Sequence, residues 1–115
     1  MMEFALVGVG GILGAWSRHI LGERIETRML DTLAVNVLGS FLFGALLALP
    51  ENDPLFLLFA IGFCGAFTTF STFAFETVRL FETGERRLAG FNAAVHLVGA
   101  LLGLAVSIGL VSVFA

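Results

Sequence analysis

One stretch of the sequence, residues 62–76, places glycines, hydroxyl side chains and phenylalanines inside a long apolar segment (Gly62-Phe-Cys-Gly-Ala-Phe-Thr-Thr-Phe-Ser-Thr-Phe-Ala-Phe-Glu76). Glycines tolerate unwound backbone, and hydroxyl groups either pair with carbonyls freed by a helix break or form a polar track. Freed carbonyls are suitable ligands for a small hard cation such as Na⁺. Ring edges carry partial positive charge, so edge-on phenylalanines attract an anion. This stretch is therefore the candidate functional site.

The phenylalanines of this stretch have helical spacing. Phe70 and Phe73 are three residues apart, and the same spacing puts Phe67 on their face. Such a stripe is typical of packing, but the adjacent hydroxyls leave an anion path as the alternative. Glu76 adds a carboxylate to the same segment, either near the membrane interface or at a pore entrance.

Polar residues also occur in two other apolar segments. Asn36 and Ser40 lie one helical turn apart, as do Asn92 and His96. A carboxamide inside a membrane span is costly unless it hydrogen-bonds across helices or faces water, so Asn36 serves either packing or a pore. His96 is a lone histidine, and the spacing of metal-ligating side chains excludes a transition-metal site built from them.

The first apolar segment carries small residues and ends in a charge. The Gly10/Gly14 and Gly11/Ala15 spacings predict close packing against another helix. Arg18 either extends to the interface or holds an anion at a vestibule.

These groups must be positioned by helices in a membrane. Of the 115 residues, 58% are hydrophobic and 13% charged, which is far from the soluble average. We predict one all-α membrane domain, residues 1–115, with four transmembrane helices at approximately 4–21, 32–49, 54–81 and 88–114. Each segment approaches or exceeds the ~20 residues that span a bilayer. The third is too long for one straight crossing, so we expect it to be broken near mid-membrane.

The remaining features set limits on the connections and partners. Residues 22–31 predict a charged, locally paired loop, and turns are expected at 50–54 and 82–87. No basic leader precedes the first segment, so we expect a retained helix. The net charge of −3 gives no reason to expect a nucleic-acid partner. Cys64 is the only cysteine and is expected to be a small core residue.

Three segments together resemble the Fluc/CrcB family of fluoride channels. They are Gly62-Phe-Cys-Gly-Ala-Phe-Thr-Thr-Phe-Ser-Thr-Phe with Glu76, Thr32-Leu-Ala-Val-Asn36-Val-Leu-Gly39-Ser, and Gly14-Ala-Trp-Ser-Arg18. The match covers nearly the whole chain.

This resemblance implies an antiparallel, dual-topology dimer of four-helix subunits in the cell inner (plasma) membrane. Two pores would export cytoplasmic fluoride passively and confer fluoride resistance, so the chain would be a channel and no enzyme. It also implies a structural Na⁺ at the dimer centre, bound by the backbone carbonyls of Gly65 and Thr68. Residue by residue, it implies that the following line the pore or the ion path: Asn36, Phe70, Ser71, Thr72, Phe73, Glu76, Asn92 and His96. Arg18 would lie at the vestibule.

The arginines are distributed unevenly along the chain. All six lie in residues 18–28 and 79–87, which four crossings place on one side of the membrane. The positive-inside rule then predicts both termini outside. Two assemblies stay open: one-way insertion with an oppositely oriented paralogue as partner, or a homodimer despite the bias.

Three other functions were compared with a fluoride channel. A small multidrug exporter needs an acidic residue inside the first helix, and this helix offers only Glu3 at its end. A membrane assembly subunit would use every glycine and phenylalanine for packing and would carry no ion. An enzyme is disfavoured because no nucleophile, base and orienting group occur at a recognisable spacing.

Overall fold

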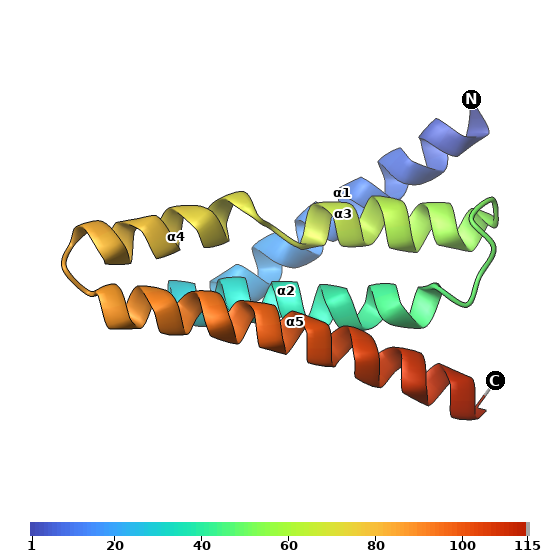
Figure 1. The fold of residues 1–115 in the computed structure, drawn as a ribbon. Coiled ribbons are helices and arrows are strands. Elements are labelled where there is room, and N and C mark those ends of the chain that lie inside the picture. Colours follow the sequence, from blue (N-terminus) through green and yellow to red (C-terminus); the bar gives the residue numbers. More distant parts are fainter. Residues whose placement is uncertain (115) are drawn as a thin grey trace.

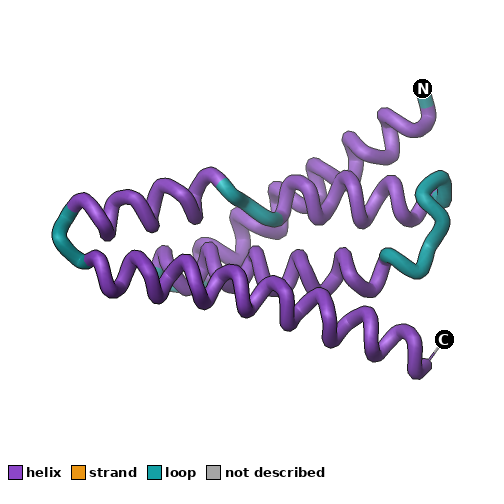
Figure 2. Tube along the Cα trace, viewed as in Figure 1, coloured by secondary structure: helices purple, strands orange, loops and turns teal. Residues whose placement is uncertain are grey.

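The computed structural model describes residues 1–114, and every described element is a helix (Figures 1 and 2). The elements are α1 (Met2–Arg24), α2 (Arg28–Leu46), η1 (Phe56–Phe63), α3 (Cys64–Phe67), α4 (Ser71–Glu82) and α5 (Arg86–Phe114). The π-helical η1 continues directly into α3, and a short non-helical segment separates α3 from α4. By length and composition, residues 2–24, 28–46, 56–82 and 86–114 are four candidate membrane spans. The predicted all-helical arrangement with a broken third span is confirmed.

The ends of the helices differ from the prediction. The first helix continues to Arg24, and the second begins at Arg28 and ends at Leu46, so the first connection shrinks to residues 25–27. The predicted local pairing of charges is wrong, because the ion pair found there joins His19 to Glu23 within α1, at 2.9 Å. A helix can continue past the hydrocarbon into charged residues, because these residues also adopt helical backbone. The apolar length of a segment therefore predicts the part of the helix that faces lipid, and the helix itself can be longer.

The break in the third span lies at residues 68–70. Thr68 has extended backbone (φ −86°, ψ 164°) and its amide donates to Cys64 O at 3.1 Å. The next backbone hydrogen bond from an amide to the carbonyl four residues earlier runs from Ala74 N to Phe70 O, at 2.8 Å. The carbonyls of residues 65–69 therefore accept no such helical hydrogen bond. Gly65 lies within the helix α3, three residues before the extended Thr68.

Small residues bring α1 and the third span together. A Cβ on Gly14 would collide with the Phe63 carbonyl, and one on Gly62 would come within 2.6 Å of Val7 O. The backbones can approach this closely only because these side chains are absent. The predicted small-residue packing of the first helix is confirmed, and it anchors the N-terminal half of the broken span.

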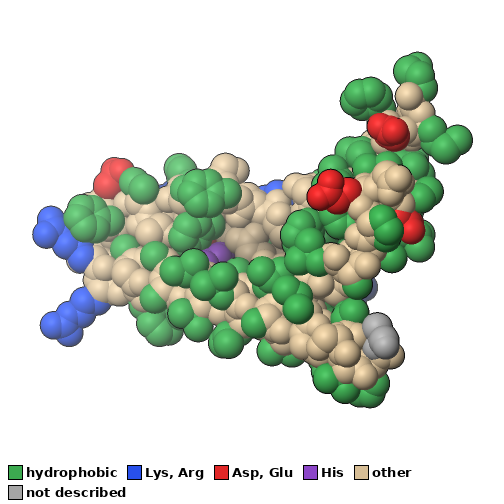
Figure 3. Space-filling view, turned by 45° about the vertical axis from the view of Figure 1, so that its right-hand side comes forward, with side chains coloured by type: hydrophobic (Ala, Val, Ile, Leu, Met, Phe, Trp, Pro, Cys, Tyr) green, Lys and Arg blue, Asp and Glu red, His purple; other side chains and the backbone are tan. Residues whose placement is uncertain are grey.

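The arginines gather toward one end of the long axis of the bundle. Figure 1 shows both termini and the α2–η1 connection at one end and the α4–α5 turn at the other. Figure 3 shows arginine side chains gathered at the end opposite the termini, with hydrophobic side chains covering much of the surface between. Large apolar side chains such as Trp16, Phe91 and Leu102 are exposed. They are suited to contact with lipid or with another membrane-embedded chain.

Candidate functional site

Asn36 on α2 holds the broken segment through two hydrogen bonds. Its Nδ2 donates to Thr69 O at 2.9 Å, and Thr69 N donates to its Oδ1 at 2.8 Å. One carboxamide thus satisfies both backbone groups of a residue that has left the helix. The expected packing role across helices is present, and Asn36 also lines a cleft.

This cleft, here called the phenylalanine cleft, has a volume of about 520 Å³. It is lined by Asn36, Ser40, Thr68, Thr69, Phe70, Phe73, Ala93, His96, Leu97 and Ala100. Polar groups from α2 and the break therefore face the ring of Phe70 at the end of the break, that of Phe73 on α4 and a histidine from α5.

The two rings of the cleft contact each other. The Phe70 and Phe73 centroids are 5.8 Å apart with planes tilted by 54°, and Phe70 is 78% exposed. The prediction that Phe67 shares their face is wrong. Phe67 is buried and stacks on Phe63 at 5.3 Å, because the break rotates the following residues away from its helical face.

His96 forms the far wall of the phenylalanine cleft. Its ring centroid lies 4.5 Å from that of Phe73, and its Nδ1 lies 3.3 Å from Asn36 Nδ2. Only 6% of the residue is exposed, and its Nε2 has no hydrogen-bond partner among residues 1–114.

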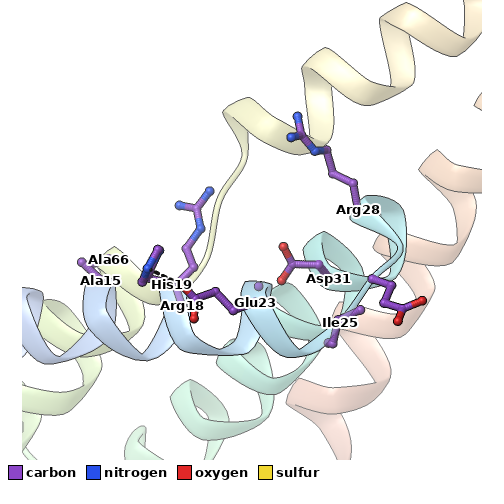
Figure 4. A pocket seen from close by; sticks show the side chains of 10 residues that line it. Ala15, Arg18, His19, Glu23, Ile25, Arg28, Asp31 and Ala66 are labelled. Carbon is purple, nitrogen blue, oxygen red and sulfur yellow. Dashed lines mark ion pairs between the residues drawn. The ribbon is translucent and has the colours of Figure 1, made fainter.

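A second, more polar hollow lies on the other side of Thr69. This arginine hollow, of about 270 Å³, is lined by Arg18, Arg28, Asp31, Thr32, Val35, Thr69 and Thr72. Figure 4 shows Arg18, Arg28 and Asp31 around an adjoining pocket of about 550 Å³, with α1 and α2 carrying them. Thr69 belongs to the walls of both the hollow and the cleft.

Side-chain hydrogen bonds join Arg18 to the start of α4. Arg18 Nη2 donates to Thr72 Oγ1 at 3.1 Å, and Thr69 Oγ1 donates to the same oxygen at 3.1 Å. Thr72 N in turn donates to Thr69 Oγ1 at 3.2 Å. The guanidinium therefore reaches back toward the break and holds a positive charge at the mouth of the hollow.

The other predicted site residues lie outside the phenylalanine cleft. Glu76 is 7% exposed; its Oε1 accepts from Thr32 Oγ1 at 2.7 Å, while its buried Oε2 has no partner in the described chain. Asn92 is buried and donates to Thr77 Oγ1 at 3.0 Å. Ser71 is exposed, with its Oγ 3.4 Å from Thr69 Oγ1. The structure thus separates these residues from the rings.

Sequence reasoning missed residues that the structure makes central. Thr32 lies one turn before Asn36, and this spacing extends the polar face that Asn36 and Ser40 mark on α2. Thr77 had no comparable signal, because its partner Asn92 lies on another helix.

Freed carbonyls border a third hollow. Gly65 and Thr68 both line a space of about 320 Å³, together with Gly39, Ser40, Phe43, Ala60, Cys64 and Leu104. A Cβ on Gly65 would meet nothing within 4 Å, so this face is open. Within residues 1–114 no group of three His, Cys, Asp or Glu side chains is placed to hold a metal ion. A cation here would depend on backbone oxygens, which suit Na⁺.

Four apolar spans, with a broken third span that supplies amide, hydroxyl and ring groups to a cleft, define a multi-pass membrane protein. Comparison with known proteins identifies its family. The model of the family described as "CrcB-like protein, Camphor Resistance (CrcB)" matches residues 5–110. The chain belongs to this family, and the resemblance found in the sequence is confirmed.

Similar curated proteins come from archaea and bacteria. The chain is 47% identical to "Fluoride-specific ion channel FluC 2" of Haloarcula marismortui over 94% of its length and 92% of the relative's. It is 46% identical to "Fluoride-specific ion channel FluC 2" of Natronomonas pharaonis, with 90% of each chain covered. It is 40% identical to "Fluoride-specific ion channel FluC" of Acinetobacter baumannii, with 84% of this chain and 82% of that one covered.

Proposed function

We propose that this chain forms a passive, fluoride-selective channel that lets cytoplasmic fluoride leave the cell down its electrochemical gradient and so confers resistance. The observation that carries the proposal is the Asn36–Thr69 clamp, which presents a backbone break and the Phe70–Phe73 ring pair to one cleft. The names of the three relatives, all fluoride-specific ion channels, support the same ion.

The lining of the cleft suits a small, strongly hydrated anion. A pore must replace the water around such an ion with close donors, without binding it too tightly to leave. Amide and hydroxyl donors and the positive edges of aromatic rings meet this need. None of the described residues lining the phenylalanine cleft is a lysine or arginine, so no fixed positive charge there would bind the anion too tightly.

The path of the ion would run through the arginine hollow and the phenylalanine cleft. Arg18 would raise the anion concentration at the vestibule, because a fixed positive charge attracts anions from solution. The hydroxyls of Ser71 and Thr72 and the amide of Asn36 would then take over water's hydrogen bonds, and Phe70 and Phe73 would line the pore. His96 would face the ion in the same cleft, and Glu76 and Asn92 would lie further along the path.

The functional unit would be an antiparallel dimer with two pores. The high exposure of Phe70 and the open face at Gly65 support a second chain against the break. The partner is either an identical chain or an oppositely oriented paralogue. Reporters of membrane side fused to the C-terminus decide between them: signal from both sides indicates a homodimer, and signal from one side a paired heterodimer.

A structural Na⁺ would sit between the two breaks of such a dimer. The carbonyls of Gly65 and Thr68 would hold it, and both residues line the open 320 Å³ hollow beside the freed backbone. When bound, the cation would supply positive charge that fixes carbonyl groups of both chains. The chain's own contribution is the unwound backbone that leaves these oxygens free.

Fluoride efflux from liposomes tests the proposal directly. Purified protein is reconstituted into liposomes loaded with potassium fluoride or potassium chloride, and release is followed with ion-selective electrodes after valinomycin is added. We expect rapid electrogenic release of fluoride and none of chloride. Absence of fluoride release in several lipid compositions, with an oppositely oriented partner chain supplied, would contradict the proposal.

A further inference from the structure

The imidazole of His96 is hydrogen-bonded at one nitrogen and unpaired at the other. Its Nδ1 faces Asn36 Nδ2 at 3.3 Å, and its Nε2 is buried without a partner among the described residues. Buried polar atoms in native proteins are nearly always paired, so an orphan at the wall of a cleft calls for an explanation.

The orientation of the Asn36 amide follows from its contact with the backbone. Thr69 N–H is a donor, so the Asn36 atom facing it at 2.8 Å must be the oxygen, Oδ1. The amide nitrogen then faces Thr69 O at 2.9 Å and His96 Nδ1 at 3.3 Å. Both hydrogens of Nδ2 are thereby directed at acceptors.

This orientation fixes the position of the histidine proton. An amide nitrogen only donates, so His96 Nδ1 must be the unprotonated acceptor. In the neutral ring, the proton therefore resides on Nε2. The break in the third span, acting through Asn36, thus turns His96 into a donor whose N–H has no acceptor within residues 1–114.

The groups around this donor would suit a small bound anion. The His96 ring packs 4.5 Å from Phe73, which in turn contacts Phe70 at 5.8 Å. No other titratable side chain occurs among the described residues that line the cleft. Because Nε2 is closed to solvent, an ion reaches it only when a neighbouring side chain moves, and Phe73 is the ring in contact.

We propose that His96 coordinates the permeating fluoride through Nε2–H, with its tautomer set by Asn36 and access opened by movement of Phe73. This inference rests on the proposed function and assigns one donor of the pore. Fluoride is the strongest hydrogen-bond acceptor among the halides, so a lone N–H donor discriminates it from chloride.

Nitrogen NMR of the histidine ring tests the inference without relying on flux. The chain has two histidines, so a His19→Gln background leaves His96 as the only signal; His19 is an exposed partner of Glu23 on α1. With ¹⁵N-histidine in lipid nanodiscs, we expect the chemical shifts of the Nε2–H tautomer. Sodium fluoride should shift the Nε2 resonance in a saturable manner, whereas sodium chloride should leave it in place.

Two substitutions separate the nitrogens of the ring. His96→Gln keeps a donor near the Nε2 position, whereas His96→Asn keeps an acceptor near the Nδ1 position and lacks the distal donor. Because a hydrogen bond to a charged group is worth a factor of about 10 to about 100, we expect fluoride efflux to fall by this factor in His96→Asn. The loss in His96→Gln should be several times smaller. Size-exclusion profiles and thermal unfolding establish that both variants fold.

The outcomes distinguish this inference from the proposed function. An Nδ1–H tautomer, or a conducting wild-type channel whose Nε2 resonance ignores saturating fluoride, would overturn the inference alone. Folded His96→Asn protein with wild-type efflux would do the same. If the wild-type chain shows the fluoride-dependent Nε2 shift but no fluoride efflux, the binding site at His96 is supported and the proposed channel function is refuted.

Discussion

The arginine hollow and the phenylalanine cleft share Thr69 but differ in what holds their walls. In the arginine hollow, side chains bond to one another: Arg18 and Thr69 both donate to the hydroxyl of Thr72. In the phenylalanine cleft, the unwound backbone depends on the single amide of Asn36. Loss of one bond in the hollow leaves others in place, whereas loss of Asn36 frees two backbone groups at once.

The difference also concerns charge. The hollow carries Arg18, Arg28 and Asp31, whereas the described lining of the cleft carries no lysine, arginine or carboxylate. Charges at a mouth attract an ion over a distance, and weak donors inside release it again. In the proposed channel, one helix break would therefore serve attraction of the ion on one side and its dehydration on the other.

Replacement of Asn36 should have the largest effect, because this residue supports the shared wall. Asn36→Leu leaves Thr69 N–H and C=O without partners, which should lower the free energy of unfolding by about 2–4 kcal/mol. Fluoride efflux should fall to the level of protein-free liposomes. Thermal unfolding and efflux measure the two losses. Ser112→Ala, on α5 and outside the cleft, serves as the control, and an Asn36→Leu protein with normal stability would refute the clamp.

Replacement of a ring should damage the cleft alone. Phe70→Ile or Phe73→Ile removes the positive ring edges while keeping an apolar side chain, so we expect efflux to be abolished while the dimer still assembles. Phe75→Ile, on the same helix but outside the cleft, provides the matched control. Cross-linking reports assembly and liposome efflux reports function. Normal flux in both cleft variants would remove the rings from the mechanism.

Neutralisation of Arg18 should affect only the mouth. Arg18→Gln retains a donor for Thr72 but removes the charge, so efflux should fall about threefold to about tenfold at low ionic strength and less at high salt. Efflux measured across a salt series gives the difference. Arg24→Gln, in the last turn of α1, controls for general surface charge. A reduction that does not depend on salt would indicate a packing role for Arg18 instead.

The smallest loss of efflux is expected for a substitution outside the arginine hollow and the phenylalanine cleft. Thr77→Val removes the acceptor of Asn92 and should lower stability by about 1 kcal/mol, with a smaller change in efflux than that of Arg18→Gln. Unfolding and efflux are measured side by side. Should Thr77→Val reduce efflux as strongly as the ring substitutions, the Asn92–Thr77 contact would limit conduction as much as the rings do.

Much of the architecture could be predicted because it depends on local properties. Apolar length predicted four helices and a third too long to be straight, and small-residue spacing predicted the close contact at Gly14. The position of the break could not be predicted in the same way. The glycines and hydroxyls of residues 62–76 indicated a break without locating it: Gly65 is helical and Thr68 is extended.

The candidate site shows the same division. The i,i+4 spacing of Asn36 and Ser40 predicted one polar face, and both residues line the phenylalanine cleft. Helical spacing placed Phe67 with the other rings and failed, because it assumed an unbroken helix. Helical spacing predicts which side chains share a face only where the helix is unbroken.

By itself, the sequence determined that this chain resides in a membrane, how many times it crosses, where its arginines lie and to which family it belongs. Each of these follows from residues close together in the chain or from whole motifs. Tertiary structure alone decided that Thr69 lines both the arginine hollow and the phenylalanine cleft, that Arg18 reaches Thr72 and that Asn36 lies beside His96. The physical reason is that a helix in lipid can open only where another helix supplies partners for the freed backbone. Those partners come from residues distant in the sequence.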